Sequence, residues 1–145
     1  MTITVTIDAD LAMVFTHATG KLDVGDVHAH RIGLREHPDY RPGMNHLIDL
    51  REAKLAPEPA ELRHLVSEDP FDGGGRRALL VADDLLYGMG RMYEMLAEQR
   101  RIAFRPFRSL ADACAWLGIP EERARAALEM PPEEGADGDT CAVTN

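Results

Sequence analysis

The pattern of apolar and polar residues is clearest between residues 76 and 118, where it predicts two strand–helix pairs. The run RALLVA at residues 77–82 is almost wholly apolar, which is typical of a strand buried on both faces of a parallel sheet. Asp83 and Asp84 follow it, and a carboxylate at this place caps a helix. This helix is expected to bury the apolar residues that recur at helical spacing: Leu85, Met89, Met92, Tyr93 and Leu96.

The second strand–helix pair follows directly. The run IAFRPF at residues 102–107 predicts another strand. Ser109, with Asp112 three positions later, is typical of a capping box and predicts the start of a helix that ends at Leu117. Together the two pairs predict a βαβα unit.

The N-terminal half has shorter elements. TITVTI at residues 2–7 alternates strictly, as a half-buried strand does, and LAMVFTH at residues 11–17 completes an antiparallel hairpin. Asp23 is the expected cap of a helix that stops before Pro38. The remaining expected elements are a strand at 46–50 and helices at 57–67 and 121–130.

These elements indicate an α/β fold with a single mixed β-sheet of about five strands. Their order is expected to be ββαβαβα plus a C-terminal helix, and right-handed crossovers make the later strands parallel. Residues 1–130 are expected to form one domain. Residues 131–145 begin with two prolines and carry only acidic charges, so we expect a disordered tail.

Composition narrows the possible partners. The chain has 145 residues and a formal net charge of −9, which argues against nucleic acid as a partner. No apolar run approaches the length of a membrane span, and the N-terminus lacks the basic start of a signal peptide. We therefore expect a cytoplasmic protein without a transmembrane segment.

Four segments carry a resemblance to a known family. They are ITVTIDADLAMVFTHATGKL, YRPGMNHLIDLREA, LLVADDLLYGMGRMYEMLAE and FRSLADACAWLG. With the order of elements, they resemble the SpoIIAA-like group of bacterial proteins, which share the STAS-type fold and are described as STAS/SEC14-domain proteins. The resemblance covers residues 2–118. It implies a small α/β domain that regulates other proteins by contact or binds apolar ligands.

The chain departs from this family at one functional position. Anti-sigma-factor antagonists of the STAS class are switched by phosphorylation of a serine near the start of the helix after the central strand. That strand is expected at residues 46–50, and residues 45–66 contain no serine or threonine. Ser67 falls at the far end of the following helix. A phosphorylation switch at the usual place is therefore chemically unavailable, because no acceptor hydroxyl exists there.

Candidate polar site residues lie where predicted strands end. Asp49 and Arg51 are expected at the carboxyl end of a parallel strand, where open α/β sheets bind ligands. They can bind a polar group there, or form an ion pair that fixes the following loop. Asp83 and Asp84 lie at the neighbouring strand end, where the alternative role is helix capping.

A methionine-rich helix supplies the apolar candidates. Met89, Met92 and Met95 lie on one predicted helix, which also contains Gly88 and Gly90. Methionine fills irregular space and lines adaptable apolar surfaces, so Met89 and Met92 are candidates for a ligand or partner surface. Ordinary core packing is the alternative for the methionines, and close helix packing is the alternative for the glycines.

No reactive motif accompanies these candidates. His28 and His30 lie two apart on a predicted helix and point in different directions, and no metal-ligand spacing occurs. The six histidines are expected at the surface or partly hydrogen-bonded. We expect no enzyme activity, no metal and no cofactor. The expected function is a STAS-like protein-interaction module, with a protein partner or a homodimer. The alternative is a protein that binds a small, lipid-like apolar molecule.

Overall fold

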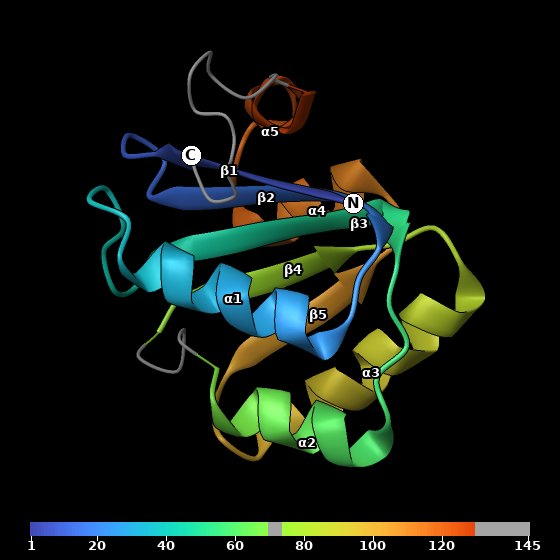
Figure 1. Ribbon diagram of the computed structural model, residues 1–145. Coiled ribbons are helices and arrows are strands. Elements are labelled where there is room, and N and C mark those ends of the chain that lie inside the picture. The colour runs from blue at the N-terminus through green and yellow to red at the C-terminus, as the bar shows by residue number, and fades with distance from the viewer. Residues whose placement is uncertain (70–73, 130–145) are drawn as a thin grey trace.

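A sheet of five strands forms the centre of the structure, a computed structural model that describes residues 1–69 and 74–129 (Figure 1). The strands lie in the order β1-β2-β3-β4-β5; β1 is antiparallel to β2, and all later neighbours are parallel. The strands are β1 (Thr2–Asp8), β2 (Met13–Lys21), β3 (Asn45–Lys54), β4 (Arg76–Leu80) and β5 (Ala103–Phe107). The helices are α1 (Val24–Arg35), α2 (Pro59–Ser67), α3 (Asp84–Glu98), α4 (Leu110–Leu117) and α5 (Glu121–Glu129).

The predicted α/β class and the mixed five-stranded sheet with an N-terminal hairpin are confirmed. The order along the chain is ββαβαβαβαα, which contains one βα unit more than the expected order. The expected tail at residues 131–145 lies outside the described residues.

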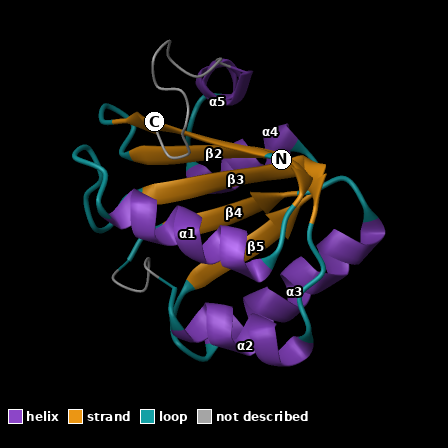
Figure 2. Ribbon diagram, viewed as in Figure 1, coloured by secondary structure: helices purple, strands orange, loops and turns teal. Residues whose placement is uncertain are grey.

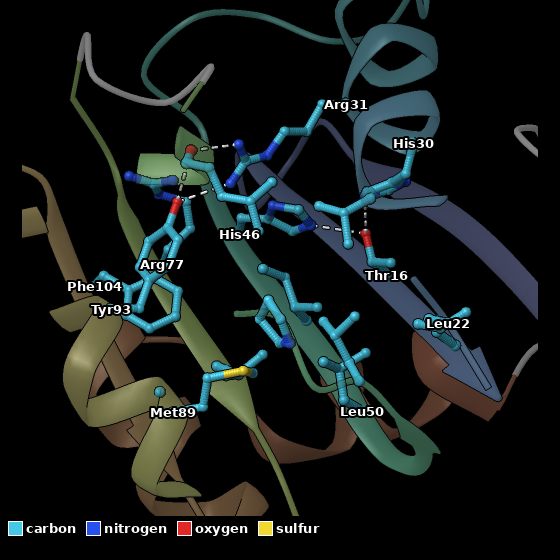
Figure 3. Close-up of a pocket in the computed structure, with 18 of the residues that line it drawn as sticks. Thr16, Leu22, His30, Arg31, His46, Leu50, Arg77, Met89, Tyr93 and Phe104 are labelled. Atoms are coloured by element: carbon cyan, nitrogen blue, oxygen red, sulfur yellow. Dashed lines mark hydrogen bonds between the residues drawn. The ribbon is translucent and has the colours of Figure 1, made fainter. Parts of the chain in front are cut away.

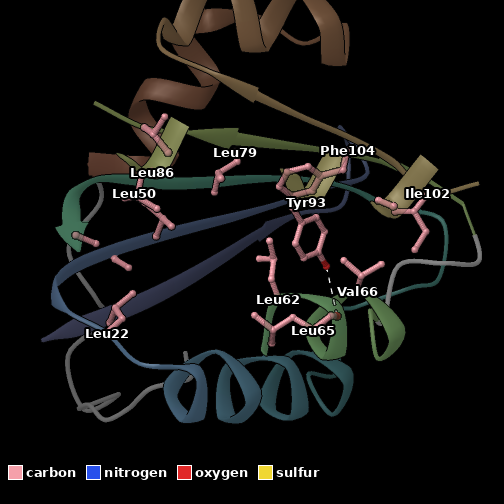
Figure 4. Packing of buried hydrophobic residues seen from close by; sticks show 14 residues of the cluster. Leu22, Leu50, Leu62, Leu65, Val66, Leu79, Leu86, Tyr93, Ile102 and Phe104 are labelled. Atoms are coloured by element: carbon pink, nitrogen blue, oxygen red, sulfur yellow. Dashed lines mark hydrogen bonds between the residues drawn. The ribbon is translucent and has the colours of Figure 1, made fainter. Parts of the chain in front are cut away.

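Helices cover both faces of the sheet (Figure 2). Side chains alternate between the faces along β3, so Leu47 packs with α4 and α5 while Leu50 packs with α1, α2 and α3. Figure 4 shows the core on the α1–α3 face, where Leu62, Leu65 and Val66 from α2 approach Tyr93 from α3. Two separate apolar layers therefore hold the sheet.

Helix α3 buries a different face from the one that its large apolar residues predict. The residues it buries are Leu86, Gly90, Tyr93 and Ala97. Leu85 is 72% exposed, against the burial that its helical spacing predicts, and Met92 is 47% exposed, so it lies at the surface and not in the core. Gly90 explains the rotation: a Cβ atom built there would lie 2.8 Å from Cβ of Pro106, so the helix backbone lies close to β5 at this point. Size and apolarity alone favour the wrong side of the helix.

Two strands are longer than their apolar runs. β2 continues to Lys21 and β3 to Lys54, and these two residues pair in register at the end of the ladder. We expected Asp49 and Arg51 at the carboxyl end of this strand. They lie within β3 instead. Backbone hydrogen bonds between neighbouring strands extend the ladder beyond the apolar runs of the sequence, which the sequence pattern does not reveal.

Candidate functional site

A pocket of about 120 Å³ lies between the sheet and helices α1, α2 and α3. Its wall is assembled from segments that are distant in the sequence: β1 supplies Ile3, α1 supplies Val27, α2 supplies Leu62 and α3 supplies Met89. Figure 3 shows how the side chains divide, with Leu22, Leu50 and Met89 at one end and the polar side chains at the other. The pocket therefore has an apolar body and a polar end.

One part of the polar end consists of Thr16 and two imidazole rings. The Thr16 hydroxyl lies 2.7 Å from Nε2 of His46 and 3.3 Å from Nε2 of His30. Burial lowers the pKa of His30 to about 4 and lowers the pKa of His46 well below its usual value. Both rings are therefore neutral at pH 7. His46 is only 2% exposed and is hydrogen-bonded to Thr16, so it takes the second of the two placements expected for the histidines.

The other part of the polar end is built around Arg31. Its guanidinium donates hydrogen bonds to the carbonyl oxygen of Leu65 at 2.6 Å and to the hydroxyl of Tyr93 at 2.8 Å. The Tyr93 hydroxyl in turn donates to Asp69 at 2.6 Å, and burial raises the pKa of Tyr93. Arg77 forms an ion pair with Asp69. This network connects α1, α2 and α3 to β4.

The predicted polar site has a different structure. Arg51 Nε lies 3.0 Å from Oδ1 of Asp49, and Nη2 lies 2.9 Å from Oδ2. Asp49 is 2% exposed and points to the face of the sheet opposite the pocket, as Leu47 does. The hydrogen bonds to Asp49 raise the pKa of Arg51. The geometry is that of a two-point ion pair, the alternative role for these residues.

The remaining candidates are the two aspartates at the start of α3 and two of its methionines. The Asp83 carboxylate accepts a hydrogen bond from the backbone N–H of Leu86 at 2.7 Å, as a helix cap does. Asp84 is exposed and lies 2.8 Å from Arg108 in an ion pair. Met89 lines the pocket, but the exposed Met92 does not. The structure therefore brings one of these six candidates, Met89, to the pocket.

Sequence reasoning missed the polar residues of the pocket. Thr16, Arg31 and His46 come from three elements, and no spacing within the sequence relates them. One signal was available: His46 directly precedes the apolar strand residues LIDL, where an imidazole is buried if its partners are close. Only the tertiary structure supplies those partners.

Comparisons with known proteins identify the fold. No family model matches this chain, and no curated protein is significantly similar to it. An uncharacterized protein of the DUF3478 family from Shewanella loihica PV-4, whose structure has a SpoIIAA-like fold, superposes with a TM-score of 0.55. The match covers 80% of this chain and 94% of the other chain, at 20% sequence identity. This chain has a SpoIIAA-like fold.

This SpoIIAA-like fold agrees with the architecture that the resemblance implied. Within the described residues, no helix is long and apolar enough to cross a membrane. In the same part of the chain, no three histidine, cysteine, aspartate or glutamate residues are grouped as metal ligands. The pocket between the sheet and helices α1–α3 is the candidate functional site.

Proposed function

We propose that this protein binds a small apolar ligand in the pocket between the sheet and helices α1–α3. The observation that supports this proposal is the composition of the pocket wall, in which leucine, isoleucine, valine and methionine side chains surround the body and polar groups gather at one end. Small-molecule sites have this character, because the apolar wall provides affinity and a few polar groups fix the orientation.

The volume of the pocket limits the size of its ligand. An apolar cavity of about 150 Å³ binds one benzene molecule, and this pocket has about 120 Å³. The ligand is therefore about the size of a benzene ring or a short alkyl chain. A complete phospholipid does not fit this space without movement of the helices.

Two substitutions on α3 test the proposal. Met89→Trp places a larger side chain at the pocket wall, whereas Met92→Trp places the same side chain on the exposed face. We expect toluene, measured by isothermal titration calorimetry, to bind the wild type and Met92→Trp alike and Met89→Trp at least tenfold more weakly. Absence of toluene binding to the wild type, or equal binding to all three proteins, would contradict the proposal.

A second function, protein interaction without catalysis, is supported by the exposed face of α3. Leu85, Met92 and Met95 are 72%, 47% and 61% exposed and lie along this face. A second copy of this chain or another protein would bury them. The helix that follows β3 has no hydroxyl before Ser67, so this module would act without the phosphorylation switch.

Light scattering after size-exclusion chromatography tests self-association. Wild type at tens of micromolar is expected to form a dimer, and Met95→Asp is expected to be a monomer with unchanged toluene affinity. A monomeric wild type would remove the homodimer from the account and leave the pocket unaffected.

A further inference from the structure

The positive charge of Arg31 lies at the polar end of the pocket. Its side chain is only 13% exposed and lines the pocket wall. The two hydrogen bonds described above join its guanidinium to the carbonyl of Leu65 and the hydroxyl of Tyr93, which are both neutral oxygens. Neutral acceptors satisfy N–H groups but do not balance the charge, and an unbalanced charge in a poorly hydrated place is unfavourable.

The nearest carboxylate balances this charge only in part. Asp69 Oδ2 lies 3.9 Å from Nη2 of Arg31, beyond hydrogen-bonding distance. This oxygen accepts the hydrogen bond from Tyr93, and Oδ1 is paired with Arg77. Asp69 is therefore held by two other side chains, and Arg31 makes no direct hydrogen bond to it in the described structure.

The other titratable groups at this end leave the pocket suited to an anion. His30 and His46 are neutral at pH 7, and each neutral ring has one N–H to donate. Tyr93 is protonated at the same pH, and its hydroxyl hydrogen is already donated to Asp69. The polar end therefore combines Arg31, close to the apolar body, with Arg77, which is paired with Asp69, and with two neutral imidazole rings that have N–H groups to donate.

We infer that the ligand is a small apolar carboxylic acid, bound as its carboxylate with that group directed to Arg31 and its hydrocarbon part among Leu50 and Met89. A guanidinium matches the two oxygens of a carboxylate in one plane, which favours this anion. The inference rests on the proposed function, because it names the class of ligand that the same pocket takes. The pocket volume restricts the hydrocarbon part of the acid to about a phenyl ring or a five-carbon chain, as in benzoate or hexanoate.

Ligands of equal chain length and different charge test whether the pocket prefers a carboxylate, separately from whether it binds an apolar molecule at all. Hexanoate, hexanamide and hexylammonium share a chain length and differ in charge, and calorimetry at pH 7.5 measures the affinity of each. We expect hexanoate to bind at least tenfold more tightly than hexanamide, and hexylammonium to bind most weakly. Equal affinity for hexanoate and hexanamide would overturn the inference but retain the apolar pocket. Absence of binding by all three and by toluene would overturn both.

A substitution on α1 tests the role of Arg31 directly. Arg31→Met removes the charge and keeps a chain of similar length, and it is expected to reduce hexanoate affinity to that of hexanamide. Hexanamide affinity should change less than twofold, which shows that the variant retains the pocket. Arg35→Met, on the exposed last turn of the same helix, serves as the control and should leave hexanoate affinity unchanged. Loss of hexanoate affinity in both variants, or in neither, would contradict the inference.

Discussion

The rings of His30 and His46 are held as neutral groups beside Thr16 inside the wall of the pocket. Their pKa values are lowered in the folded protein, to about 4 for His30 and further below the usual range for His46. An unfolded chain binds protons at these histidines once the pH falls through about 6.5. Burial of the two neutral rings therefore costs no stability above that pH. The free energy of unfolding decreases as the pH falls from about 6.5 toward 4.

The corresponding prediction concerns His46→Gln. Between pH 7 and pH 5 the wild type should lose about 2 kcal/mol of unfolding free energy for each histidine that stays neutral when folded. His46→Gln should lose about 2 kcal/mol less over the same range, because it has one such group fewer. Urea unfolding at the two pH values measures the difference. His28→Gln, at an exposed position of α1, should behave as the wild type does. An identical loss in His46→Gln and wild type would show that the ring is protonated in the folded state.

The sequence predicted residues that act locally better than residues that act through tertiary contacts. Asp23 and Ser109 cap their helices as expected, because the capping side chain and the backbone N–H that donates to it lie three positions apart. The burial of His46 depends on Thr16, thirty positions away along the chain. No local pattern specifies such a pair, so the polar end of the pocket could not be predicted from the sequence.

At the scale of elements, α3 illustrates both the success and the limit of apolar periodicity. The helix occurs where the pattern predicted it, and Asp83 begins it. Its orientation differs, because apolar residues occur on more than one side and Gly90 determines which side approaches β5. A glycine adds nothing to an apolar pattern, although its missing side chain permits the closest contact.

The two glycines of α3 provide a paired prediction. An alanine at Gly88 meets no atom within 4 Å, so Gly88→Ala should raise the unfolding free energy by up to about 1 kcal/mol through helix propensity. An alanine at Gly90 meets Pro106 at 2.8 Å and Leu79 at 3.2 Å, so Gly90→Ala should be less stable than the wild type. The variants should differ by about 1–3 kcal/mol in urea unfolding. Equal stability of the two would show that α3 does not pack closely on β5.

At the scale of the whole molecule, the fold was more predictable than the site. Each strand and helix has a local apolar pattern, and the short connections between them restrict the topology to a mixed sheet with crossover helices. The pocket depends on how three helices pack on one face of that sheet. Its wall combines side chains such as Leu50, Leu79 and Met89 from three different elements, which no single segment encodes.

The most direct test of the pocket is its location in solution. A methyl-selective NMR titration with toluene reports which side chains meet the ligand. We expect saturable shifts at Leu50, Leu79 and Met89 on the α1–α3 face. The methyl groups of Leu110, Leu117 and Leu128 in the opposite layer should remain unshifted. Shifts spread over both layers, or no saturable shift at the pocket residues, would contradict the account.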